Sequence, residues 1–127
     1  MRVEVVDASA VAALYFGEPE AAAIADRLGD AQLIAPVLIR FEMSNIALKK
    51  IVRAPSTAPG VMDRLVAFLA GPLEICDVEH GEALSLAVRS RLTAYDASYL
   101  WLARHRHCGL VTLDRQLERA AAEFLTS

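Results

Sequence analysis

Four short apolar runs that alternate with longer helical segments are the feature that most constrains the fold of this chain. The length and β-branched content of the runs favour buried strands, at residues 3–6, 32–35, 73–78 and 109–113. Helical patterns fill the intervals, at residues 9–15, 20–28, 36–53, 61–70, 81–92, 93–107 and 114–125. Strands that alternate with helices predict an α/β sandwich with a central, mainly parallel sheet.

Proline and glycine mark the boundaries between these elements. Pro36 is predicted to occupy the first turn of the long helix, where its missing N–H is tolerated. Residues 54–60, with the sequence APSTAPG, are predicted to form the loop of a helical hairpin. Because this loop is too short to link two domains, a single domain over residues 1–127 is expected.

Charge and cysteine spacing narrow the class of protein. The formal net charge of −3 argues against a general nucleic-acid binder but is compatible with an enzyme that has an acidic metal site. Cys76 and Cys108 lack the Cys-x-x-Cys spacing of a zinc site. The charged N-terminus lacks the apolar core of a signal peptide, and no apolar run reaches membrane-spanning length. We therefore expect a cytoplasmic protein with free thiols and no membrane association.

Two of the strand-like runs lead into an aspartate. Asp7 follows residues 3–6, and Asp114 follows residues 109–113. If these strands are parallel neighbours, both carboxylates emerge at the edge of the sheet where ligands bind in such folds. A structural role is the alternative for each, because aspartate is a preferred helix N-cap and both residues precede helical sequence.

Glu42 is a carboxylate within the long helix of residues 36–53. Leu38 and Ile46 lie closest to it around the helix, and Asn45 shares its stripe one turn further on. A carboxylate among apolar neighbours is costly to bury unless a partner satisfies it. That partner is either a lysine or arginine in a salt bridge or a divalent cation.

Asp96 stands at the front of the helical stretch LTAYDASYLWLARH. Thr93 and Asp96 match the Thr-x-x-Asp capping box, which alone would account for this aspartate. Together with Asp7, Glu42 and Asp114 it makes four acids, which would repel one another at one site unless a cation neutralised them. Hard oxygen ligands suit Mg²⁺ or Mn²⁺. The set therefore predicts hydrolysis of a phosphodiester by metal-activated water.

Four ordered motifs, VVDASA, FEMSNIALKK, LTAYDASYLWLA and LVTLDRQL, resemble those of PIN-domain ribonucleases. The resemblance runs through nearly the whole chain and is strongest to the VapC-type toxins of type II toxin–antitoxin systems. It implies a three-layer α/β/α fold whose central sheet has four or five strands. It also implies a Mg²⁺- or Mn²⁺-dependent endoribonuclease that cleaves structured RNA, such as transfer or ribosomal RNA. A homodimer and inhibition by a cognate antitoxin are further implications.

The resemblance also assigns roles to individual residues. The family's acidic quartet, which binds metal and carries the catalysis, is matched by Asp7, Glu42, Asp96 and Asp114. The polar groups that orient these carboxylates are matched by Ser9, Asn45 and Thr112. RNA also needs cationic contacts to its phosphates, for which the candidates are Lys49, Arg104 and Arg115.

Two features depart from the family pattern. Many relatives carry a further acid or amide just after the fourth acid, whereas this chain has Arg115, Gln116 and Leu117 there, so the number of metal ions stays open. The C-terminal sequence AAEFLTS leaves little room for a last strand, which favours a sheet of four strands. The alternative function is a non-catalytic PIN-fold interaction module, which loss of metal binding in Asp7→Asn or Asp96→Asn would distinguish from a nuclease.

Overall fold

A four-stranded parallel sheet forms the centre of the protein, described here over residues 1–125 by a computed structural model. The strands are β1 (Val3–Val6), β2 (Gln32–Pro36), β3 (Glu74–Cys76) and β4 (Gly109–Val111), in the spatial order β3-β2-β1-β4. All three pairings are parallel, and the register places Val5 between Ile34 and Leu110. The predicted parallel α/β architecture is confirmed, with four strands in the described residues.

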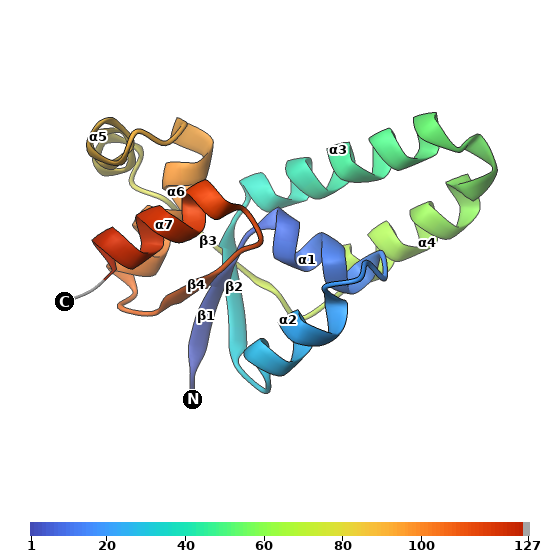
Figure 1. Cartoon of the computed structure of the whole chain (residues 1–127), viewed down its shortest axis with the longest axis horizontal. Coiled ribbons are helices and arrows are strands. Elements are labelled where there is room, and N and C mark those ends of the chain that lie inside the picture. Colours follow the sequence, from blue (N-terminus) through green and yellow to red (C-terminus); the bar gives the residue numbers. More distant parts are fainter. Residues whose placement is uncertain (126–127) are drawn as a thin grey trace.

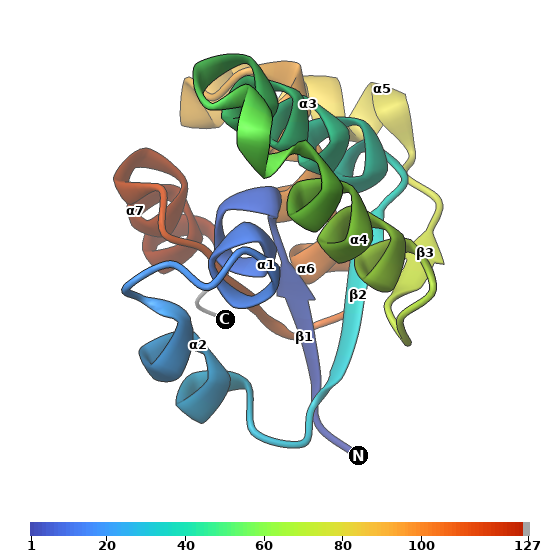
Figure 2. The same cartoon turned by 90° about the vertical axis from the view of Figure 1, so that its right-hand side faces the viewer.

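Helices cover both faces of this sheet. Residues 1–125 contain α1 (Ala8–Tyr15), α2 (Ala21–Leu28), α3 (Leu38–Arg53), α4 (Ala58–Leu69), α5 (His80–Ser90), α6 (Ala94–His105), α7 (Arg115–Phe124) and a 3-10 helix, η1 (Pro55–Thr57). α5, α6 and α7 lie on one side of the strands and α1 to α4 on the other, which confirms the three-layer sandwich (Figure 1). Figure 2 looks onto the layer of α1 to α4, with the strands behind it.

α6 is the helix that anchors the core. Every residue from Ala97 to Ala103 is buried, and the helix packs against β1, β2 and β4 as well as α5 and α7. A helix that is apolar on nearly all sides requires such an enclosed position. Its first turn, with Asp96, is therefore held rigidly relative to the strands.

Two boundary predictions were wrong. Pro36 does not open the long helix: it ends β2 and pairs with Cys76, and α3 begins at Leu38. Residues 54–60 do not form an irregular loop, because η1 and the first turn of α4 occupy them, with both prolines near helix starts. Proline suits any position where its N–H is not needed, so local sequence did not distinguish a strand end from a helix start.

Other expectations concern the cysteines and the chain ends. Cys76 and Cys108 are free thiols, as predicted, and burial raises the pKa of both. No helix in the described residues has the length and apolar character needed to cross a membrane. No strand follows β4 within residues 1–125. The predicted domain and its C-terminal segment also include residues 126 and 127, which lie outside the described residues.

Candidate active site

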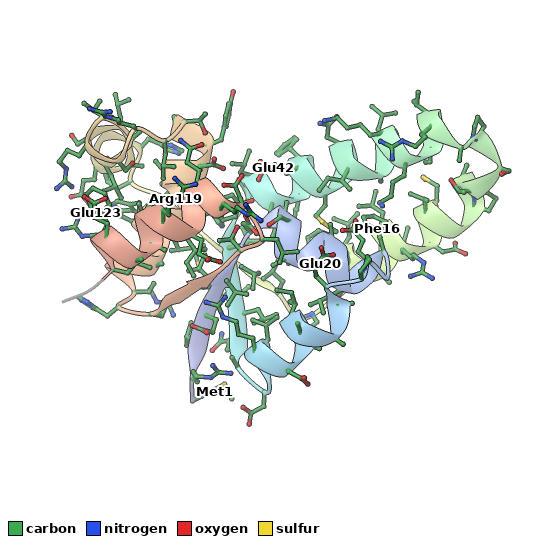
Figure 3. The ribbon with its side chains drawn as sticks, viewed as in Figure 1. Met1, Phe16, Glu20, Glu42, Arg119 and Glu123 are labelled. Atoms are coloured by element: carbon green, nitrogen blue, oxygen red, sulfur yellow. The ribbon has the colours of Figure 1, made fainter. Side chains whose placement is uncertain are left out.

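A cleft at the carboxyl ends of β1 and β4 brings the four predicted acids together. It has a volume of about 270 Å³, and its lining includes Asp7, Glu42, Asp96 and Asp114. From β1 the chain continues to β2 and β3 on one side of the sheet, and β4 is added on the other side of β1. The direction in which strands are added therefore changes between β1 and β4. Ligands of open parallel sheets bind at such a switch point. Figure 3 shows Glu42 near the start of α3, at the centre of the molecule.

Asp7 is the most enclosed of the four acids, with 6% of its surface exposed. Its Oδ1 accepts hydrogen bonds from Ser9 Oγ at 2.7 Å and from the backbone N–H of Ala10 at 3.1 Å. Its Oδ2 accepts a hydrogen bond from Thr112 Oγ1 at 2.5 Å. Three donors converge on one carboxylate, which orients it and favours its ionised form.

The two hydroxyl groups beside Asp7 are themselves held by the backbone after β4. Ser9 Oγ accepts a hydrogen bond from the N–H of Leu113 at 2.9 Å, and Thr112 Oγ1 accepts one from the N–H of Asp114 at 3.0 Å. Each hydroxyl can therefore donate its single proton to Asp7. Ser9 and Thr112 lie where the sequence predicted supporting polar groups, and they couple the ends of β1 and β4.

The capping roles of the aspartates coexist with their place in the cleft. Asp7 caps α1 through Ala10, and Asp114 Oδ1 caps α7 by accepting from the N–H of Leu117 at 2.9 Å. At α6 the cap is Thr93, whose Oγ1 accepts from the N–H of Asp96 at 3.1 Å, so the carboxylate of Asp96 is not needed for that bond. Capping fixes the position of each acid without using all of its oxygens.

Tyr99 also lines the cleft, although nothing in the sequence singled it out as a site residue. Its Oη donates a hydrogen bond to Glu42 Oε1 at 2.5 Å, and only 1% of its surface is exposed. Within residues 1–125, Glu42 forms no salt bridge, so this tyrosine is its partner instead of the lysine or arginine considered above. The available signal was spacing, because Tyr99 follows Asp96 by three residues and shares its side of α6.

Burial and mutual repulsion raise the pKa of three of the four acids. Burial is the main cause for Asp7, Glu42 and Asp96 alike. The bonds to Asp7 lower its pKa in part, and the bond from Tyr99 does so for Glu42. The charge of Asp114 raises the pKa of Asp7 and of Asp96, and the charges of Asp96 and Asp7 raise that of Glu42. The carboxylates thus form one electrostatically coupled group.

The donors in the cleft fit a hard divalent cation. Among the residues of 1–125 that line the cleft there is no imidazole or thiol, and its acids offer only oxygen ligands, which Mg²⁺ and Mn²⁺ prefer. In the part of the chain that the structure describes, no three or more His, Cys, Asp or Glu side chains form a ready-made group that could hold a metal ion. Mg²⁺ requires no such closed group, because it keeps several waters and binds through one or two carboxylates.

The remaining predicted residues lie at different distances from the acids. Asn45 and Lys49 line the cleft from α3, and both are exposed. Arg115 is the exposed first residue of α7, next to Asp114, but it does not line the cleft. Arg104 lies in the last turn of α6, at the opposite end from Asp96, and lines another pocket. The structure therefore places only Lys49 of the three candidate cations beside the acids.

The Tyr99→Phe variant tests the hydroxyl bond to Glu42. Because this bond stabilises the charged carboxylate, its loss is expected to raise the pKa of Glu42 further, by an amount measurable in a carboxyl carbon NMR titration. Tyr95→Phe is the matched control, since Tyr95 lies on the same helix and is 66% exposed. An unchanged titration of Glu42 in Tyr99→Phe would contradict this role.

The three raised pKa values predict an unusual pH dependence of stability for the metal-free protein. A carboxyl with a raised pKa binds its proton more tightly in the folded protein than in the unfolded chain. Its charged form therefore destabilises the fold at pH values above the folded pKa. This destabilisation disappears as the pH falls toward 3.8, the ordinary pKa of an aspartate. Asp96→Asn is therefore expected to raise the melting temperature in chelator by a few degrees at pH 7.5. The gain should shrink at pH 5, which calorimetry can measure, and a gain that grows instead would refute the assignment.

The fold and its acidic cleft define a PIN-type α/β protein, and the comparison with known proteins agrees. The chain belongs to the PIN-domain family, whose model matches residues 5–123. It is 33% identical over 128 residues to Ribonuclease VapC3 of Pyrobaculum aerophilum, covering 96% of this chain and 97% of that protein. Its fold is similar to the crystal structure of PAE2754 from Pyrobaculum aerophilum, with a TM-score of 0.78 and 26% identity, over 94% of this chain and 85% of the other.

Proposed function

We propose that this protein is a Mg²⁺- or Mn²⁺-dependent endoribonuclease toxin that cleaves structured RNA, such as transfer or ribosomal RNA. The observation that carries the proposal is the convergence of four carboxylates at the switch point of the sheet. Among the described residues none of these acids has a cationic partner within ion-pair distance. The 33% identity to Ribonuclease VapC3 supports the same activity.

The four acids have different proposed roles in metal binding and catalysis. Asp7, Asp96 and Asp114 would hold the cation and its waters, while Glu42 would bind it or orient the attacking water. When bound, the cation lowers the pKa of a water molecule and neutralises charge that develops on the phosphate. Ser9 and Thr112 orient Asp7 through their hydroxyl bonds and offset part of the rise in its pKa that burial causes. Asn45 lines the cleft one turn along α3 from Glu42, where it would help to orient the carboxylates, and Lys49 would contact the RNA at the mouth of the cleft.

Glu42 is suited to accept the proton of the attacking water. Its Oε1 is fixed by Tyr99, which leaves Oε2 for the water, and its raised pKa makes it a better base than an ordinary glutamate. As the water oxygen bonds to phosphorus, its proton passes to Glu42, the phosphorus bond to the leaving ribose oxygen breaks, and that oxygen takes a proton from solvent water. Hydrolysis then leaves a phosphate on one RNA end and a hydroxyl on the other.

A cognate antitoxin and a second copy of the chain are the proposed protein partners of this cytoplasmic toxin. Large apolar side chains remain exposed along the α3–α4 hairpin, at Phe41, Leu48, Val52, Met62 and Val66. The hairpin extends away from the sheet, so its outer surface is open to another molecule (Figure 1). Apolar patches of this kind mark protein interfaces.

Cleavage of total cellular RNA by the purified protein tests the proposal. We expect discrete fragments with Mg²⁺ or Mn²⁺ and none in excess chelator, and readdition of the metal should restore cleavage. Full activity in chelator would exclude metal-activated water. Absence of cleavage at every metal concentration, together with tight binding of an antitoxin, would favour the non-catalytic interaction module.

A further inference from the structure

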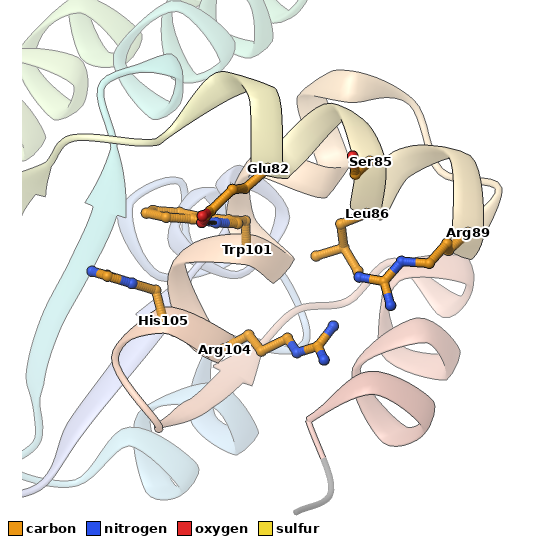
Figure 4. Close-up of a pocket in the computed structure, with 7 residues that line it drawn as sticks. All are labelled: Glu82, Ser85, Leu86, Arg89, Trp101, Arg104 and His105. Atoms are coloured by element: carbon orange, nitrogen blue, oxygen red, sulfur yellow. Dashed lines mark hydrogen bonds between the residues drawn. The ribbon is translucent and has the colours of Figure 1, made fainter.

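A second pocket lies between α5 and α6, separate from the acidic cleft. It has a volume of about 320 Å³, and in the described part of the chain the pocket and the cleft have separate lining residues. α5 contributes Glu82 and Arg89 to it, and α6 contributes Trp101, Arg104 and His105 (Figure 4). This combination of cations and aromatic rings has no part in the chemistry proposed above.

Two guanidinium groups enter this pocket from different helices. Arg89 lies in the last turn of α5 and Arg104 in the last turn of α6, and Figure 4 shows their ends on the same side of the pocket, pointing toward each other. Within residues 1–125 neither forms an ion pair, and Arg89 lies over the ring of Phe124, 5.8 Å from its centroid. The C-terminal end of each helix stabilises the positive charge of its own arginine. The two guanidinium groups nevertheless repel each other, and an anion bound between them would remove this repulsion.

The other side of the pocket is aromatic. The rings of Trp101 and His105 are stacked, with centroids 4.6 Å apart and planes at 12°. Trp101 Nε1 donates a hydrogen bond to Glu82 Oε1 at 2.9 Å, which fixes the indole and keeps this carboxylate away from the arginines (Figure 4). Trp101 is nearly buried while His105 is exposed, so the imidazole is the accessible end of the stack.

We propose that this pocket binds a phosphate of the RNA strand between Arg89 and Arg104, with an adjacent base against His105. Paired guanidiniums suit a phosphate, and aromatic rings beside cations are the usual means of holding single-stranded nucleic acid. The inference rests on the proposed nuclease function. It adds a binding site for the strand outside the cleft where the strand is cut.

The charge of the molecule explains why such a site is needed. The acids of the cleft repel a phosphodiester backbone, and Lys49 is the one cation among the described residues that line it. α6 links the two sites, because Arg104 follows Asp96 by eight residues, about 12 Å along the axis.

Tryptophan fluorescence tests the site directly, because Trp101 is the only tryptophan of the chain. The full-length protein is titrated in excess chelator, so that nothing is cleaved, with inorganic phosphate and with a short single-stranded RNA. We expect a saturable change with both probes and the higher affinity for RNA. Arg89→Gln and Arg104→Gln should each raise the Kd for RNA roughly tenfold and reduce the slope of log affinity against log salt by about one.

Arg53→Gln and Arg104→Lys are the controls for this titration. Arg53 is another exposed arginine in the last turn of a helix, α3, but lies far from the pocket, so its loss should leave the Kd unchanged. Arg104→Lys keeps the charge and should keep the salt slope. Equal Kd and salt slope in wild type, Arg89→Gln and Arg104→Gln would overturn the proposed phosphate site.

Cleavage kinetics separate this inference from the proposed function. With metal present, Arg89→Gln and Arg104→Gln should raise the KM for RNA by a similar factor and leave kcat unchanged, because neither residue touches the acids. A wild-type protein that cleaves no RNA would contradict the nuclease, whereas normal cleavage with unaltered KM in both variants would contradict only the phosphate site. Variants that lose affinity for an acidic peptide but not for RNA would assign the pocket to a protein partner instead.

Discussion

Replacement of Asp96 by asparagine is expected to slow RNA cleavage on the order of a thousandfold. The carboxylate lies in the first turn of α6 and lines the cleft with the other acids, and burial together with the charges of Asp114 and Asp7 raises its pKa. Asparagine has nearly the same shape but lacks the negative charge that holds a divalent cation. Losing several kcal/mol of charge stabilisation in the transition state corresponds to a loss of this size. The rate is measured on a labelled RNA with saturating Mg²⁺ or Mn²⁺.

The same variant should also bind the metal more weakly while remaining folded. Calorimetric titration of Mn²⁺ is expected to show loss of measurable binding in Asp96→Asn and in Asp7→Asn. Asp63→Asn is the matched control, since Asp63 is an exposed acid of α4 outside the cleft, and its rate and affinity should equal those of wild type. Undiminished cleavage by Asp96→Asn would falsify the proposed mechanism, whatever the fold.

Leu100→Ala is expected to lower the free energy of unfolding by about 2–5 kcal/mol. Leu100 has no exposed surface and lies in the middle of α6, the helix that packs against three strands and two other helices. Removing its side chain leaves a cavity that the rigid neighbours fill only in part, so the loss exceeds the transfer free energy of the deleted atoms. Denaturation in urea, followed by circular dichroism, gives the value.

An exposed leucine separates this packing effect from helix propensity. Leu84 lies in α5 and is 59% exposed, so Leu84→Ala should change the unfolding free energy by less than about 0.5 kcal/mol. Leucine and alanine are both good helix formers, and the difference between the two variants therefore reports burial. A loss in Leu100→Ala no larger than that in Leu84→Ala would mean that α6 is not the anchor of the core.

Much of the candidate site could be predicted from local sequence. Asp7 and Asp114 are recognisable because each follows a strand-like run, and parallel strands bring their carboxyl ends to one edge. Glu42 is recognisable because a carboxylate among apolar neighbours needs a partner. The capping pattern of Thr93 and Asp96 predicted the start of α6, which the structure confirms.

Other parts of the site depended on contacts between distant segments. Tyr99 and Glu42 are 57 residues apart, so nothing local indicates that the tyrosine hydroxyl would serve the glutamate. Arg104, at the end of the helix that carries Asp96, was predicted as a contact for RNA phosphates. A 12-residue helix separates its two ends by many ångströms, and Arg104 lies beside Arg89 instead. Its neighbours across the pocket come from α5, which periodicity does not identify.

The sequence by itself determined the alternation of strands and helices, the parallel sheet and the four acids at strand ends and helix starts. These features follow from short-range physics, because side-chain periodicity, turn residues and caps act over a few positions. Only the tertiary structure decided that Pro36 ends a strand, that Tyr99 holds Glu42, and that two arginines converge between α5 and α6. Such pairings depend on how α3, α5 and α6 pack around the sheet, and packing is a property of the whole chain.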